Sequence, residues 1–262
     1  MELVDICFNF THKDFRKDED QVLQRAVNVG VNTMILAGAS LNESEDAVNL
    51  ALQYPSHCYC AAGTHPHNAK EWKDDDKERL LALCKKTIVR AVGECGLDYY
   101  HDLSPRDKQR LVFEKQIQIA EETSMPLLLH QREAHKDFLS ILDLYKGRIN
   151  HAVVHCFTGD KSQLFNYLDR GFYIGITGWI CDETRGRHLH DLVSLIPSDR
   201  LMIETDAPYL IPHDLEPTPE NNRNEPAYLP HILKTIARNR NESDVELAAQ
   251  TTATAKKFFS IL

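Results

Sequence analysis

The sequence predicts an α/β fold in which eight βα units close into a TIM-type (β/α)8 barrel. Eight short apolar runs alternate with segments of helical pattern, and each run is nearly continuous, as in parallel strands that are covered on both faces. The length of 262 residues is also close to the usual size of such a barrel, about 250 residues. An open, doubly wound sheet is the alternative, but the sequence contains neither GxGxxG nor GxxxxGK(S/T).

The expected elements follow one another along the whole chain. Strands are predicted at residues 3–10, 32–38, 57–65, 88–94, 126–130, 151–157, 172–177 and 201–206, and helices at residues 18–30, 42–54, 75–86, 105–123, 133–145, 161–171, 186–196, 228–238 and 243–259. Asn42 and Glu45 resemble a capping box, and Ser104 before Pro105 predicts a helix N-cap. Because no linker-like segment interrupts the pattern, residues 1–262 are predicted to form a single domain.

Composition and charge narrow the class of protein. The chain opens on an apolar strand without a basic leader, and no apolar run approaches the roughly 18 residues of a membrane span, so we expect neither export nor a membrane partner. Seven scattered cysteines predict reduced thiols in a cytoplasmic enzyme. The net charge of −9 argues against broad, non-specific binding of nucleic acid. A local phosphate site remains possible where a metal ion supplies positive charge.

Polar residues with metal-binding side chains follow three neighbouring apolar runs. Glu94 follows IVRAVG, His130 follows PLLL, and His155 follows AVV, with about one βα repeat between successive residues. In a barrel they would lie on strands four, five and six, at the end where catalytic residues gather. Two imidazoles and one carboxylate form a recurring catalytic metal site, because they leave coordination positions open. The alternative is three unrelated polar residues at strand ends.

Further candidates lie near the same end of the predicted barrel. Asp206 ends the eighth apolar run, where it could bind a metal and accept a proton from water, although an aspartate before Ala-Pro could also form a turn. His65 and His67 in GTHPH could bind metal, hold a phosphate or protonate a leaving group, or could be solvated loop residues. Arg132 and Arg223 could each bind a phosphate, or pair with Glu133 and Glu225 respectively.

Seven segments resemble one known family in order along nearly the whole chain. They are GTHPH, VGECGLDY, LLLHQREAH, VVHCFTG, YIGITGWICDE, IETDAPYL and RNEPAYLPHI. Together they are similar to the TatD family of metal-dependent deoxyribonucleases. The resemblance implies a barrel of the metal-dependent hydrolase superfamily, and a nuclease that hydrolyses phosphodiester bonds. For the branch that gives the family its name, it further implies 3′ to 5′ exonuclease action on single-stranded DNA and RNA.

The resemblance also implies site residues and cofactors. Glu94, His130 and His155 are similar to metal ligands, Asp206 to the catalytic carboxylate and a metal ligand, and His65 and His67 to catalytic or substrate-binding residues. Mg²⁺ is the implied cofactor, with Mn²⁺ or Zn²⁺ as alternatives, and the expected protein is a monomer with a role in DNA repair or nucleic-acid turnover.

One departure concerns the first strand. Most members of the family carry an HxH pair there that helps to hold a second metal, whereas this chain has Cys7 and Asn9. Cysteine suits a soft metal and asparagine is a weak neutral ligand, which argues against a stable two-metal centre and leaves open whether one or two ions bind.

Other functions remain open from the residues themselves. The same barrel and ligand types could serve a hydrolase of a small ester, amide or lactone, or an aminoacyl-tRNA deacylase-like activity. A non-catalytic binding protein with a structural metal is a third possibility, although structural zinc sites usually have four protein ligands. If the protein is a nuclease, Trp179 or Tyr209 could stack on bases of a single strand.

Overall fold

The computed structural model describes residues 1–149 and 151–261, and eight strands form one sheet in the order β1 to β8. The strands are β1 Leu3–Phe8, β2 Val31–Ala37, β3 Cys58–Ala62, β4 Val89–Asp98, β5 Leu127–Arg132, β6 Ala152–Val154, β7 Tyr173–Ile176 and β8 Leu201–Ile203. The pairs β3–β4, β4–β5, β5–β6 and β7–β8 are parallel. Just beyond β8 and β1, the Asp206 N–H donates to the Cys7 carbonyl at 3.0 Å, which brings the last strand to the first. The predicted (β/α)8 barrel is therefore confirmed.

Nine helices separate and follow these strands in the part of the chain that is described. They are α1 Glu19–Asn28, α2 Leu41–Gln53, α3 Asp76–Cys84, α4 Arg106–Thr123, α5 His135–Asp143, α6 Lys161–Leu168, α7 Arg187–Leu192, α8 Leu229–Arg240 and α9 Asp244–Phe258. Short 3-10 helices lie at η1 Lys13–Phe15, η2 Pro66–Glu71, η3 Gly178–Cys181, η4 Val193–Leu195 and η5 Pro226–Tyr228. Seven of the strands are buried along most of their length, which explains their nearly continuous apolar sequences.

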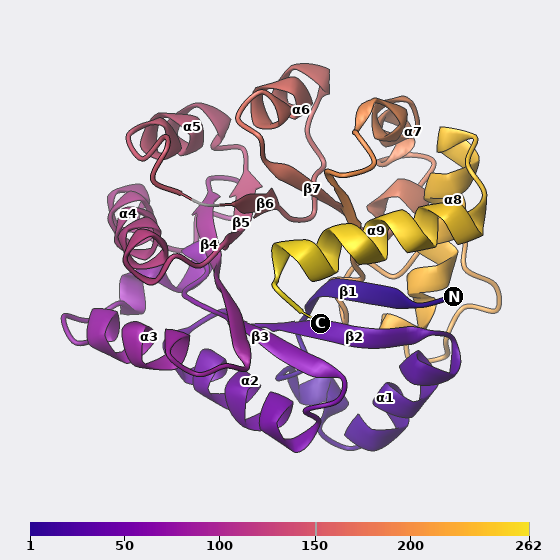
Figure 1. Ribbon diagram of the computed structural model, residues 1–262, viewed down its shortest axis with the longest axis horizontal. Coiled ribbons are helices and arrows are strands. Elements are labelled where there is room, and N and C mark those ends of the chain that lie inside the picture. The colour runs from indigo at the N-terminus through magenta and orange to yellow at the C-terminus, as the bar shows by residue number, and fades with distance from the viewer. Residues whose placement is uncertain (150, 262) are drawn as a thin grey trace. The chain divides into compact units, whose positions relative to one another are not determined.

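The chain divides into two compact units, one formed by Met1–Ile35 and Cys156–Leu262 and the other by Leu36–His155. In the second unit, helices α2, α3 and α4 pack against β3 and β4 (Figure 1). In the first unit, α9, yellow in Figure 1, packs against β1. The single-domain interpretation of residues 1–262 stays a prediction.

Two buried glutamines on α4 hold backbone segments that follow β3 and β4. Gln109 accepts from the Asp98 N–H at 2.8 Å and donates to the carbonyls of Asp98 at 3.0 Å and Ser104 at 2.8 Å. Gln116 accepts from the Thr64 N–H at 2.7 Å and donates to the Thr64 carbonyl at 2.9 Å. Residues two helical turns apart share a helix face, so α4 supports both segments with one face.

The predicted N-caps of two helices are wrong. Ser40, rather than Asn42, caps α2 by accepting from the Glu43 N–H at 3.2 Å, because the helix begins one residue before Asn42. Ser104 does not cap α4, whose N-cap position is Pro105. The Ser104 hydroxyl instead donates to the His67 carbonyl at 2.7 Å and accepts from the Lys70 N–H at 3.1 Å, so it fixes the segment after β3.

The seven cysteines are free thiols, and all but Cys156 are buried. Burial raises the pKa of Cys58 and Cys84 to about 12 each. Among the described residues, no helix combines the length and the apolar character that crossing a membrane requires.

Candidate metal centre and active site

Strand β4 carries two carboxylates of the candidate site. The sequence predicted that this strand ends at Glu94, but it continues to Asp98 because Cys95 and Leu97 are also buried. Glu94 therefore lies inside the strand and Asp98 ends it. Side chains four positions apart along a strand point to the same face, so both carboxylates project to one side of the sheet.

Gly96 lets strands β4 and β5 approach closely beside His130. The two residues are register partners in the parallel pairing, and Gly96 has a φ of +149°. A Cβ at this position would overlap the His130 carbonyl oxygen and would lie 2.8 Å from the carbonyl carbon. Glycine is required here because both the space and the backbone conformation exclude a side chain. A larger residue at this position would displace His130.

Three ligand atoms converge in the second unit. Glu94 Oε1 lies 2.7 Å from His155 Nε2 and 3.0 Å from His130 Nδ1, and the two imidazole nitrogens lie 3.3 Å from each other. Glu94 and His155 are buried, and His130 is half-buried. The structure thus brings together the three residues whose spacing predicted a metal site.

In His130 and in His65, the partner of one ring nitrogen determines which of the two nitrogens carries the proton. His130 Nε2 lies 3.3 Å from Asp98 Oδ2, so this nitrogen can donate to a carboxylate and leave the Nδ1 lone pair directed at the converging donors. Such a carboxylate–histidine pair is the usual support of a metal-binding imidazole. His65 differs, because its Nδ1 accepts from the His67 N–H at 3.1 Å and its Nε2, 3.3 Å from Glu94 Oε1, must carry the proton. His65 therefore suits a donor to Glu94 better than a metal ligand.

Burial and neighbouring charges shift the pKa values of these groups. Burial lowers the pKa of His65 to about 4, more than Glu94 raises it, so its ring is neutral at pH 7. Burial also opposes ionisation of Glu94, but the attraction of His155 and His65 outweighs it and holds the Glu94 pKa well below its usual range. Glu94 is therefore an anion, which is the form in which a carboxylate binds a metal.

These donors fit a divalent cation. One carboxylate oxygen and two imidazole nitrogens face each other within 2.7–3.3 Å. Without a cation between them, the lone pairs of the two nitrogens would be directed at each other. Three protein ligands leave positions for water and substrate, as in catalytic sites.

Asp98 and His101 were missed by sequence reasoning. The fully buried Asp98 carboxylate lies 2.8 Å from His67 Nε2 and 2.8 Å from His101 Nδ1, in addition to its contact with His130. Burial disfavours the Asp98 carboxylate, but the hydrogen bonds of these histidines hold its pKa below its ordinary range. The spacing of Glu94 and Asp98 on one strand was the signal that could have identified Asp98.

Asp206 lies in the first unit with the two residues that replace the HxH pair. Its Oδ1 accepts from the Asn9 amide at 2.9 Å and lies 3.9 Å from Cys7 Sγ, and its backbone has a φ of 55°. The Asn9 side chain thus presents its nitrogen, not its oxygen, to Asp206. This contact orients the carboxylate and offers no second oxygen ligand at that point.

Asp5, a fully buried carboxylate, lies on β1 two residues before Cys7. It accepts from the Thr205 N–H at 2.9 Å and is also hydrogen-bonded to the Thr205 hydroxyl. Burial raises the Asp5 pKa to about 7, against the lowering effect of the Thr205 hydrogen bonds.

The two candidate arginines have different surroundings. The Arg132 guanidinium stacks over the Tyr100 ring at 4.3 Å, and its residue ends β5 two positions after His130. Arg223 pairs with Asp18 at 2.7 Å and with Glu225 at 2.5 Å, and only 9% of its side chain is exposed. Glu225 is the partner that the sequence offered as the alternative to phosphate.

A comparison with family models decides the family. Residues 4–260 match the model described as TatD related DNase. The chain belongs to this family. It is a family of metal-dependent hydrolases that act on ester bonds of nucleic acid, and the resemblance seen in the sequence is confirmed.

Individual relatives cover the chain from end to end. A "3′-5′ ssDNA/RNA exonuclease TatD" of Citrobacter rodentium is 49% identical over 259 residues, which is 99% of this chain and 98% of the relative. The protein of the same name from Escherichia coli K12 is 44% identical and covers 99% of both chains. Among solved structures, a TatD homologue of Escherichia coli, YJJV, has a TM-score of 0.91 at 25% identity, covering 99% of this chain and 98% of the other.

Proposed function

We propose that the protein is a metal-dependent 3′ to 5′ exonuclease on single-stranded DNA and RNA. Family membership and the names of relatives covering 99% of the chain support the nuclease activity. The observation that carries the proposal is the convergence of Glu94, His130 and His155, with Asp98 behind His130, because it provides an open site for a divalent cation.

We assign the cation to Glu94 Oε1, His130 Nδ1 and His155 Nε2. Mg²⁺ is the proposed physiological ion, and Mn²⁺ or Zn²⁺ should also bind, since imidazole nitrogen suits the latter ions. When bound, the ion supplies Lewis-acid polarisation of a phosphoryl oxygen and an acidified water. The His65 Nε2–H donates a hydrogen bond to Glu94 and so orients the carboxylate toward the other two ligands.

The proton transfers are assigned to an aspartate and a histidine. Asp206, held by Asn9, is the proposed catalytic carboxylate that accepts the proton of the attacking water, and it remains a candidate metal ligand. His67 is the better candidate to protonate the leaving oxygen, because its Nε2 lies 2.8 Å from the Asp98 carboxylate, whereas His65 is neutral at pH 7. Arg132 would bind a phosphate beside His130. Arg223 would bind a phosphate only by releasing one of the two carboxylates that engage it, Asp18 or Glu225.

End-labelled oligonucleotides test the activity most directly. Single- and double-stranded substrates are incubated with Mg²⁺, Mn²⁺ or Zn²⁺, with EDTA as the control, and the products are separated on a gel over time. We expect mononucleotides released from the 3′ end of single strands only when metal is present. Internal cuts would contradict exonuclease action, and cleavage of small esters, amides or lactones with intact oligonucleotides would contradict the nuclease assignment.

The metal ligands have their own test. Glu94→Gln and His155→Ala should abolish most turnover and weaken metal binding measured by calorimetry, while circular dichroism remains that of the parent protein. Turnover and metal affinity equal to those of the parent would contradict the ligand assignment.

We further propose that the enzyme acts as a cytoplasmic monomer in DNA repair or nucleic-acid turnover. The free thiols support a reducing compartment. Cell fractionation and light scattering of the purified protein test location and oligomeric state.

A further inference from the structure

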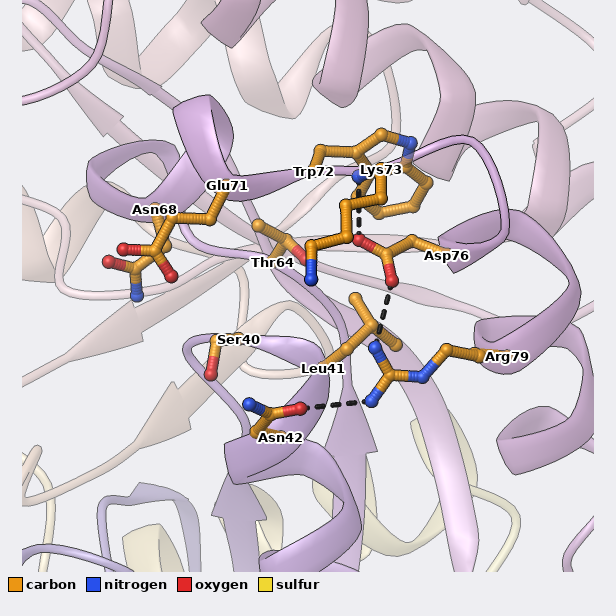
Figure 2. A pocket seen from close by; sticks show the side chains of 10 residues that line it. All are labelled: Ser40, Leu41, Asn42, Thr64, Asn68, Glu71, Trp72, Lys73, Asp76 and Arg79. Atoms are coloured by element: carbon orange, nitrogen blue, oxygen red, sulfur yellow. Dashed lines mark hydrogen bonds and ion pairs between the residues drawn. The ribbon is translucent and has the colours of Figure 1, made fainter.

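A pocket of about 80 Å³ lies beside the segment that carries His65. It is formed within the second unit between the start of α2, the segment after β3 and the start of α3 (Figure 2). Thr64 belongs to its wall, and the next residue is His65, whose Nε2 contacts Glu94. Consecutive Cα atoms are about 3.8 Å apart, so one peptide bond joins the pocket wall to the metal-binding cluster.

Two groups that lack partners point into this pocket. Thr64 is 4% exposed, and its hydroxyl oxygen is buried without a hydrogen-bond partner among the described residues. The Lys73 ammonium makes no ion pair in the described part of the chain, and Figure 2 shows it extending toward Thr64. A buried hydroxyl and a cation without a partner are both satisfied by an anionic oxygen.

The backbone of α2 adds to the attraction for an anion. Ser40 caps this 13-residue helix, and its first residues, Leu41 and Asn42, line the pocket. The first N–H groups of a helix have no partner within the helix, and they carry the positive end of its dipole.

Arg79 is the second cation that lines the pocket, and it is already paired with other residues. Arg79 pairs with Asp76 at 2.9 Å and Glu45 at 2.9 Å, and donates to Asn42 at 2.9 Å. An arriving anion would therefore meet the free charge of Lys73 rather than that of Arg79. The Glu71 carboxylate, beside Asn68 in Figure 2, disfavours a second anionic group and can accept from a sugar hydroxyl.

The size of the pocket limits what enters it. A volume of about 80 Å³ holds a phosphate group or a few water molecules, each of which takes about 30 Å³ in the liquid. A whole nucleotide does not fit, so its base would lie outside. Trp72 is half-exposed at the rim and provides an aromatic face for that base.

We propose that this pocket binds one phosphate of the nucleic-acid strand through Lys73, Thr64 and the N-terminus of α2, while the adjoining base stacks on Trp72. The inference rests on the proposed nuclease function and adds a substrate subsite next to the catalytic cluster. It also explains how a chain of net charge −9 can attract a polyanion at one place.

The test compares kinetics and binding of four variants. Lys73→Gln, Thr64→Val and Trp72→Ala are measured against Lys77→Gln, a matched control on α3 that removes a lysine paired with Glu122 at 3.4 Å. KM and kcat are determined on a single-stranded oligonucleotide with Mg²⁺, and binding of the same labelled strand is followed by fluorescence anisotropy over a range of salt concentrations. Inorganic phosphate and a mononucleotide serve as competitors, to separate a strand phosphate from a free one.

We expect Lys73→Gln to raise KM about 5- to 10-fold and to reduce the salt slope of log K by about 0.7, with kcat little changed. Trp72→Ala should raise KM about 5- to 100-fold. Thr64→Val should raise KM while thermal stability is retained or increased, since the hydroxyl has no partner to lose. A purely structural threonine would show the opposite pattern.

The outcomes separate this inference from the proposed function. If the parent enzyme digests single strands but Lys73→Gln and Thr64→Val match Lys77→Gln, the subsite is refuted and the function stands. If the parent neither cleaves nor binds oligonucleotides, both are refuted. If it binds them without cleavage and Lys73→Gln weakens binding, only the nuclease activity is refuted. If inorganic phosphate competes for binding as strongly as the strand does, the assignment of this pocket to a phosphate of the strand is overturned.

Discussion

Replacing Gln116 with leucine should loosen the segment that carries His65. The side chain is buried on α4 and pairs with both backbone groups of Thr64, at 2.7 and 2.9 Å. Leucine is similar in size but cannot form either hydrogen bond. A buried backbone group without a partner costs about 1–3 kcal/mol, so two such groups cost about 2–6 kcal/mol before relaxation. Because leucine is less costly to bury than an amide, we expect a net loss of about 2–4 kcal/mol in the free energy of unfolding.

The assay is urea unfolding followed by circular dichroism, together with calorimetric titration of metal. Gln118→Leu is the matched control, since Gln118 is exposed on the same helix and, among the described residues, donates to the Tyr145 hydroxyl at 2.9 Å. The control should change the free energy of unfolding by less than about 0.5 kcal/mol. Metal affinity should also fall in Gln116→Leu, because His65 would no longer orient Glu94. A loss of stability no larger than that of the control would refute the reasoning.

Three further predictions concern the strands that carry the site. Gly96→Ala should lower the free energy of unfolding by about 1–3 kcal/mol and weaken metal binding, because its φ of +149° and the His130 carbonyl oppose a Cβ; unchanged metal affinity would contradict this. Asp98→Asn should reduce metal affinity or turnover about 10- to 100-fold through His130, measured by titration and kinetics, with little change in fold. The pKa of Asp5 is raised to about 7 from 3.8, so the folded protein retains a proton that the unfolded chain loses as pH rises from about 4 to 7. Stability should therefore decline over this window, and Asp5→Asn should remove up to about 4 kcal/mol of that decline in urea unfolding at pH 4.5 and 8; equal pH profiles would contradict the raised pKa.

The fold could be predicted because burial leaves a direct mark on sequence. Strands inside a barrel are covered on both faces, so apolar runs recur at the spacing of βα units. The predicted ends of the strands and helices were less accurate, as β4 shows. The sequence predicts that the apolar run ends at Glu94, because a carboxylate rarely continues a buried strand. The strand continues because histidines surround that carboxylate, and a sequence pattern does not include partners from other strands.

The candidate site shows the same limit. The residues Glu94, His130 and His155 could be selected from their places after apolar runs, and the structure places their donor atoms within 3.3 Å of one another. Asp98 could have been found from its spacing to Glu94. The proton of His65, by contrast, depends on the backbone N–H of His67, and the pocket at Thr64 depends on the meeting of α2 and α3. The proton position of His65 and the pocket at Thr64 both depend on three-dimensional contacts, which a sequence pattern does not contain.

The two glutamines of α4 have a consequence for how this barrel could be altered. Loops of a barrel are often treated as modules that can be exchanged independently. Here the segment after β3 and the segment after β4 are both attached to a single helix, through Gln116 to Thr64 and through Gln109 to Asp98 and Ser104. A chimera that receives either segment from another enzyme would also have to receive α4, and the smallest exchangeable unit extends from the end of β3 to the end of this helix.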